Sequence, residues 1–270
     1  MSHRLLAAAC SPGDHGFCAP GTDAFNPTPL WTFEVAGLHF QITRIMLVSW
    51  IITVVVIAVM VASVRRPRLV PNRLQWAGES AYSFIRDGVA REVIGAEGLR
   101  FAPYLATVFL FILANNILGI IPLVQIAPTS RIAVPAFLAA ISWVLFLSLG
   151  IRRHGFVPYF RDMLFPPGVP KPMYVLITPI EFLSTVIVRP FTLAVRLFAN
   201  MFAGHLLLLV FALGTTYLLT VGNFSVVFFP VSFLMSVVMT FFELLVEALQ
   251  AYIFTVLTAV YLQGALVEEH

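Results

Sequence analysis

The sequence carries very little charge for its length. Only 11% of its 270 residues are charged and 60% are hydrophobic, whereas soluble domains carry about 25% charged residues. So few charged side chains cannot cover the surface of a water-soluble protein, and a soluble enzyme is therefore excluded. The 25 phenylalanines and the long apolar runs require burial, which also excludes a disordered chain.

The sequence also lacks the patterns of two common kinds of binding site. Its net charge is only +3, and its basic residues fall in short gaps between apolar runs, so they form no nucleic-acid-binding patch. Its two cysteines, Cys10 and Cys18, are too few for a disulfide scaffold, and no ligand-spaced histidine accompanies them. They could form one bridge or remain free. We expect no metal site and no cofactor.

Five apolar stretches are long enough to cross a membrane, since a spanning helix needs about 20 apolar residues. Each of the last two would be about 60 Å long as a single helix. Their turn signals cluster between them, from Gly214 to Asn223, so two long, strongly tilted helices are favoured over two hairpins. We expect an all-α membrane protein with an outer arm over 1–44 and one membrane domain over 45–270, with spans near 45–64, 101–125, 132–151, 173–213 and 224–264.

The basic residues predict the orientation of the chain. Seven fall in residues 65–100 and four in residues 152–171, whereas Arg4, Arg44 and Arg131 are the only ones near the opposite ends of the spans. Because cytoplasmic loops are enriched in Lys and Arg, the N-terminus is expected outside and the C-terminus in the cytoplasm. Residues 75–94 mix aromatic and charged side chains, which predicts an amphipathic cytoplasmic helix.

The fourth stretch has one polar face. At 100° per residue, seven polar residues share an arc of about 100°, whereas His205 lies on the opposite side. A charge near the bilayer centre costs about 2.5–3.5 kcal/mol on insertion scales, so this face must contact protein or water. The seven residues are Thr178, Glu181, Thr185, Arg189, Thr192, Arg196 and Asn200.

The fifth stretch also has a polar line. Its residues extend over about 21 Å, which suits a water-lined proton route, although polar side chains also serve packing between membrane helices. The line consists of Ser236, Thr240, Glu243, Glu247 and Gln250.

These polar residues differ in how strongly they indicate function. Glu181 and Arg189 lie near the inner end of their helix, where structural pairing or snorkelling explains them. Arg196 has no acidic residue three or four positions away, so its guanidinium needs an anion from elsewhere, such as another subunit. His205 and Glu243 suggest proton exchange. For Glu247, function and packing remain equally open.

Two motifs are more specific than these patterns. Residues 194–205 read AVRLFANMFAGH and residues 249–262 read LQAYIFTVLTAVYL, and NNILGIIP at 115–122 and PIEFLSTVIVRPFTLAVRLFAN at 179–200 support them. Together they resemble the F-type ATP synthase subunit a family, the membrane stator of a rotary proton motor. The resemblance is close over the last 100 or so residues and holds for the rest in topology and size.

The resemblance implies roles for particular residues. Arg196 matches the arginine that faces the carboxylates of the rotating c-ring and prevents protons from passing directly between two half-channels. Asn200 matches a polar channel residue, His205 and Glu243 match a pair lining the outer half-channel, and Gln250 matches a glutamine near the arginine. The implied partners are the c-ring, the peripheral-stalk b subunits, the rest of the F1Fo complex and membrane lipid. The implied location is a bacterial plasma membrane, and the chain would have no catalytic site of its own.

The chain departs from the family pattern at three places. Ala199 stands where a glycine is usual. His205 stands where many bacterial members carry an acid and Glu243 where some carry histidine, so the acid and the imidazole look exchanged. Glu247 is an additional acid.

Three other readings explain less of the sequence. A proton-coupled secondary transporter also buries Arg, His and Glu, but it would usually show paired halves or broken helices around a solute site. An intramembrane enzyme needs a nucleophile or metal motif, and neither HExxH nor GxSxG occurs. A structural helix scaffold gives no reason for Arg196.

Overall fold

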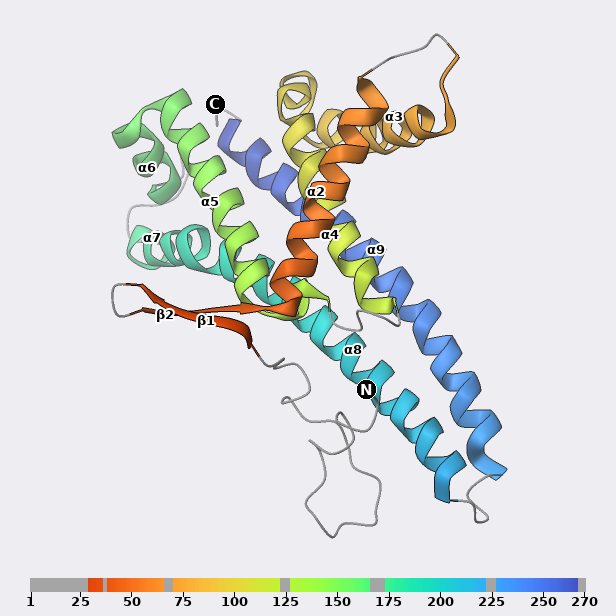
Figure 1. Cartoon of the computed structure of the whole chain (residues 1–270). Coiled ribbons are helices and arrows are strands. Elements are labelled where there is room, and N and C mark those ends of the chain that lie inside the picture. Colours follow the sequence, from red (N-terminus) through yellow and green to blue (C-terminus); the bar gives the residue numbers. More distant parts are fainter. Residues whose placement is uncertain are drawn as a thin grey trace. The chain divides into compact units, whose positions relative to one another are not determined.

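Helices account for most of the structure, a computed structural model in which residues 29–35, 38–65, 70–121, 127–165, 173–221 and 227–266 are described (Figure 1). Within these residues, five helical segments are long and apolar enough to cross a membrane. This confirms the expected all-α membrane class and the number of spans. The segments are Arg44–Val64, Ala96–Ile120, Ala133–His154, Tyr174–Thr220 and Phe229–Leu266. Cys10 and Cys18 lie outside the described residues.

The spanning segments form helices because a backbone in lipid must satisfy its own hydrogen bonds. This requirement overrides local preference in α2 (Arg44–Val64), which is rich in β-branched residues that otherwise favour strands. α4 (Ala102–Ile120) and α5 (Ala133–His154) are the second and third long helices. α5 ends at Gly155, whose φ of 86° lies in the left-handed region that glycine tolerates.

The last two spans are single long helices and not hairpins. The fourth runs without a break through α7 (Tyr174–Leu183), the π-helical η6 (Ser184–Val188) and α8 (Arg189–Val221), and its candidate span is 47 residues long. The fifth, α9 (Phe229–Leu266), has 38 residues. α8 continues past Gly214, where a turn was expected, because an isolated glycine costs a helix only about 1 kcal/mol. The strong tilt of both helices in the membrane remains a prediction.

A proline explains the π-helical segment of the fourth span. Pro190 has no N–H group, so it cannot donate to a carbonyl of the preceding turn. The indole Nε1–H of Trp143 on α5 donates instead to the carbonyl of Thr185, five residues before Pro190, at 3.3 Å. The indole thus supplies a donor where the proline cannot, and the chain continues as a helix.

The arm before α2 contains a β-hairpin that the sequence analysis missed. β1 (Pro29–Val35) pairs antiparallel with β2 (Leu38–Thr43), and the register places Trp31 opposite Ile42. Strands of six or seven residues are too short to stand out in a search for apolar runs of spanning length.

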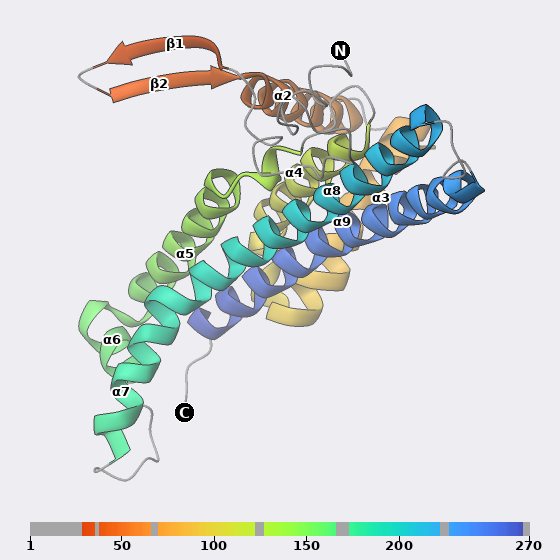
Figure 2. The same ribbon diagram turned by 90° about the horizontal axis from the view of Figure 1, so that it is seen from below.

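The chain forms two compact units, each built from three parts of the sequence. The first comprises Met1–Val55, Leu113–Ser130 and Ala199–Leu249, and the second comprises Val56–Ile112, Arg131–Phe198 and Gln250–His270. In the first unit the C-terminal part of α8 and the N-terminal part of α9 lie side by side (Figures 1 and 2). Thr215 and Ser232 join them through a hydroxyl–hydroxyl hydrogen bond of 2.9 Å. The single membrane domain expected over 45–270 remains a prediction.

The second unit contains an apolar core. The segment predicted to be an amphipathic cytoplasmic helix is helical, as α3 (Arg73–Ile85) followed by the π-helical η2 (Arg86–Ile94), and its amphipathic character and its position in the cytoplasm remain predictions. Its buried residues Ile85 and Val89 belong to the same cluster as Leu105 of α4, Phe146 of α5 and Leu262 of α9. Arg153 also forms an ion pair with Glu97 within this unit.

Candidate functional site

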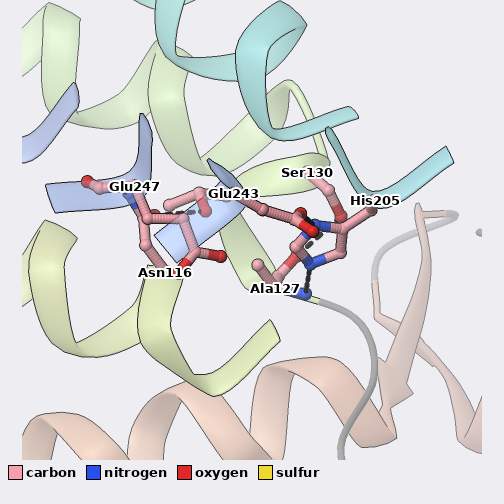
Figure 3. A network of polar contacts seen from close by, with 7 residues as sticks. Asn116, Ala127, Ser130, His205, Glu243 and Glu247 are labelled. Carbon is pink, nitrogen blue, oxygen red and sulfur yellow. Dashed lines mark hydrogen bonds and ion pairs between the residues drawn. The ribbon is translucent and has the colours of Figure 1, made fainter. Parts of the chain in front are cut away.

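Three ionisable side chains from distant parts of the sequence meet inside the first unit (Figure 3). His205 comes from α8, and Glu243 and Glu247 lie one turn apart on α9. The exposed fractions are 4% for His205, 4% for Glu243 and 0% for Glu247. Each offers a nitrogen or oxygen atom within 4.8 Å of those of the other two. The site is therefore compact and its three side chains are buried.

His205 is held through both ring nitrogens. Its Nδ1 atom pairs with Oε1 of Glu243, and its Nε2 atom accepts a hydrogen bond of 3.1 Å from the backbone N–H of Ala127. A metal ion would have to displace one of these bonds to reach the imidazole. The arrangement therefore suits proton exchange at the two carboxylates better than it suits a metal centre.

A second layer of polar groups fixes the cluster in place. Asn116 of α4 donates to the backbone carbonyl of Glu247 at 3.4 Å and accepts from the hydroxyl of Thr129 at 2.7 Å. The hydroxyl of Ser130 donates to the carbonyl of Ala127 at 2.6 Å. The sequence analysis did not place Asn116 at the site. The signal that could have found it is the pair of adjacent amides at 115–116 within an apolar helix.

Two glycines allow the helices to approach the pair of His205 and Glu243. A Cβ atom on Gly119 of α4 would overlap the imidazole of His205. A Cβ atom on Gly204 of α8 would lie 3.0 Å from Oε1 of Glu243. Any larger residue at Gly119 would therefore displace the imidazole.

The carboxylates border a cavity in the first unit. It has a volume of about 330 Å³ and is lined by Asn200, Gly204, Glu243, Glu247 and apolar side chains of α8 and α9. Oε2 of Glu243 and both carboxylate oxygens of Glu247 are buried without a hydrogen-bond partner among the described residues. Such oxygens need either a proton or water, because an unpaired buried charge is costly. A cavity of this size holds several water molecules.

The second unit holds the other two residues expected at the proton pathway. Arg196 is exposed and Gln250 is buried. No ion pair of Arg196 is present among the described residues. Within the described residues, the chain therefore supplies no acidic partner for the guanidinium of Arg196.

The other polar residues predicted on the fourth and fifth spans either contact nearby residues or are partly exposed. Arg189 lies over the ring of Tyr261 at 5.6 Å, a cation–π contact rather than an ion pair with an acid. Glu181 is half-buried. Thr240 donates to the carbonyl of Ser236 at 2.8 Å, as threonines in membrane helices often do. Because η6 is π-helical, the residues before it are rotated relative to those after it, and a uniform step of 100° does not describe this face.

Comparison with known proteins gives consistent matches over nearly the whole chain. The family model described as "ATP synthase A chain" matches residues 46–263. ATP synthase subunit a of Parafrankia sp. (strain EAN1pec) is 48% identical over 254 residues, which cover 94% of this chain and 85% of the relative. The Rhodococcus erythropolis protein of the same name is 45% identical over 273 residues, covering 100% and 98%. The Streptomyces lividans protein is 43% identical over 256 residues, covering 94% and 90%.

Proposed function

The chain belongs to the ATP synthase A chain family, the proton-translocating stator subunit of the Fo motor, and we propose that Glu243, Glu247 and His205 form the proton site of its outer half-channel. The observation that supports this proposal is the buried cluster of the three side chains beside the cavity. Its partnerless carboxylate oxygens can bind and release protons without rearrangement of the helices. Asn200 lines the same cavity and would continue the polar route toward the rotor.

Arg196 would act at the rotor surface. It is exposed and has no ion pair among the described residues, so it is available to the carboxylates of c-ring subunits. A guanidinium stays charged and would stabilise the ionised form of each ring carboxylate that passes it. Its fixed positive charge would also prevent protons from crossing directly between the outer and inner half-channels. Gln250, in the same unit, would lie near the arginine.

Proton flow through the two half-channels would then rotate the ring. A proton from the outer path neutralises a ring carboxylate, which can enter lipid, and another carboxylate releases its proton to the inner path. Moving one elementary charge through 100 mV is worth about 2.3 kcal/mol, so several protons per turn could drive ATP synthesis. No feature of the described residues favours the alternative of a proton-coupled secondary transporter.

The chain is a multi-pass membrane protein of the F1Fo complex. Its finer placement is part of the proposal. The c-ring and the peripheral-stalk b subunits would be its direct partners, within a bacterial plasma membrane. The excess of arginine in residues 65–100 and 152–171 supports a cytoplasmic location for these segments, which puts the N-terminus outside and the C-terminus inside.

Substitution of the two acids tests the proposed proton site. We expect Glu243→Gln and Glu247→Gln each to slow proton flow, and His205→Ala to slow it as well, because each change removes a proton acceptor or its partner. ATP-driven proton pumping and passive proton flow after removal of F1 would be measured in inverted membrane vesicles. Glu92→Gln is the matched control, since Glu92 is exposed on η2. If Glu243→Gln, Glu247→Gln and the variant that carries both changes all conduct protons as fast as Glu92→Gln, the proposal is wrong.

A further inference from the structure

We infer that the backbone amide of Ala127 holds His205 as the neutral tautomer with its proton on Nδ1, so that Glu243 and Glu247, and not the imidazole, carry the excess proton. This inference rests on the proposed function for the part that concerns proton transfer. The tautomer itself follows from the hydrogen bonds of the site alone. In this arrangement Ala127 is a positioning residue that acts through its main chain.

The direction of the hydrogen bond at Nε2 is fixed by chemistry. A backbone N–H can only donate, so Nε2 of His205 must present a lone pair to Ala127. A neutral imidazole with a bare Nε2 carries its proton on Nδ1. The Nδ1–H group then donates to Oε1 of Glu243, which is the second bond of the ring. All hydrogen bonds of the ring are therefore consistent with this one tautomer.

The residue that supplies this amide is anchored in a turn through its carbonyl group. The carbonyl of Ala127 accepts from both the backbone N–H of Ser130, at 3.0 Å, and the Ser130 hydroxyl, at 2.6 Å. Thr129, which lies in the same turn, donates to Asn116 of α4, and Ala127 is fully buried. Since Gly119 leaves space for the imidazole beside this turn, the ring and the amide stay in contact.

A second proton on His205 would destroy this contact. An imidazolium has an N–H group at both ring nitrogens, and its Nε2–H would point at the N–H of Ala127. The titratable groups packed around the ring are Glu243 and Glu247, both from α9, whereas α4 and the turn contribute amides and hydroxyls among the described residues. The atoms that can accept an incoming proton are the carboxylate oxygens of these two acids that have no hydrogen-bond partner among the described residues. The proton route would thus follow one turn of α9, with His205 as a fixed donor to Glu243.

Solid-state NMR of the assembled complex in lipid tests the tautomer directly. The histidines would be labelled with ¹⁵N and ¹³C, and the signal of His205 would be identified by its loss in a His205→Gln variant. We expect a neutral ring protonated at Nδ1 at neutral pH. A ring protonated at Nε2, or an imidazolium at neutral pH, would overturn the inference.

A pair of substitutions at Ala127 tests the role of the amide. Ala127→Pro removes the N–H group, whereas Ala127→Gly keeps it and serves as the matched control. In Ala127→Pro the Nε2 atom no longer faces a backbone N–H, so we expect part of the ring signal to come from the tautomer protonated at Nε2, which the control lacks. Identical ring spectra in the two variants would contradict the inference. If Ala127→Pro does not assemble, the spectra of the unmodified and Ala127→Gly complexes decide the question.

The two proposals fail in different ways. A ring protonated at Nδ1 with proton flow unaffected by the substitutions at Glu243 and Glu247 would refute the proposed pathway and leave the tautomer intact. Slowed proton flow in those variants together with a charged imidazole would refute only the inference.

Discussion

The close contact between Gly119 and His205 makes a sharp prediction about proton flow. In Gly119→Ala the new Cβ atom would overlap the imidazole and would also come within 3.0 Å of the Cβ atom of Ala127. The main chain of Ala127 is fixed by its turn, so the ring is the part that must move. Its displacement would weaken the bonds to both Ala127 and Glu243.

The size of the effect follows from the cost of overpacking. Inserting a methyl group into a filled site costs about 1–3 kcal/mol. If the proton-transfer state bears this cost, proton flow falls about 5- to 150-fold, since each 1.4 kcal/mol corresponds to about a factor of ten. Because the closest contacts of the new methyl group are with the side chains of His205 and Ala127 and not with backbone, the complex should still assemble.

A graded series of glycine substitutions provides the assay with its controls. A Cβ atom on Gly264 meets nothing within 4 Å, so Gly264→Ala should pump normally. A Cβ atom on Gly204 lies 3.0 Å from the carboxylate tip of Glu243, which can shift slightly, so Gly204→Ala should have an intermediate effect. ATP-driven pumping in inverted vesicles would be compared at equal amounts of assembled complex. If Gly119→Ala pumps as fast as Gly264→Ala, the packing argument for the His205 site is wrong.

Two further substitutions test other parts of the chain. Arg196→Ala should abolish ATP-driven proton pumping while the complex still assembles, because the fixed charge between the half-channels is lost; normal pumping would refute the role of Arg196. Trp143→Phe removes the donor to the carbonyl of Thr185 and should destabilise the protein by about 1–3 kcal/mol. The thermal unfolding midpoint of the purified complex measures this loss, and an unchanged midpoint would mean that the indole does not support the π-helical segment.

The sequence predicted the membrane helices well because lipid makes hydrophobic length decisive. A segment of about 20 apolar residues has no alternative to a helix in a bilayer, and the five expected spans are present. The π-helical segment η6 could not be predicted in the same way. It depends on a contact between Trp143 and Thr185, which lie 42 residues apart, and Pro190 alone does not specify how its missing donor is replaced.

The candidate site could be predicted only in part, because only some of its groups produce a recognisable signal in the sequence. Glu243, Glu247 and His205 stand out because ionisable residues are rare in apolar helices. The groups that position these three side chains do not stand out in the sequence. Ala127 acts through its backbone, and Gly119 acts through the side chain that it lacks. A search for polar side chains therefore finds the ionisable residues of the cluster and misses the groups that orient them.

The environment of Arg196 supports the proposal that another subunit supplies its counter-charge. An arginine in the middle of a membrane helix costs at least about 2.5–3.5 kcal/mol unless a partner compensates it. Arg189, about two turns earlier on the same face by sequence, rests on the ring of Tyr261, whereas Arg196 is exposed and has no ion pair among the described residues. The chain thus compensates one arginine internally and leaves the other available at its surface. An acidic group on a neighbouring subunit would explain this difference, as the proposed pairing of Arg196 with the carboxylates of the c-ring requires.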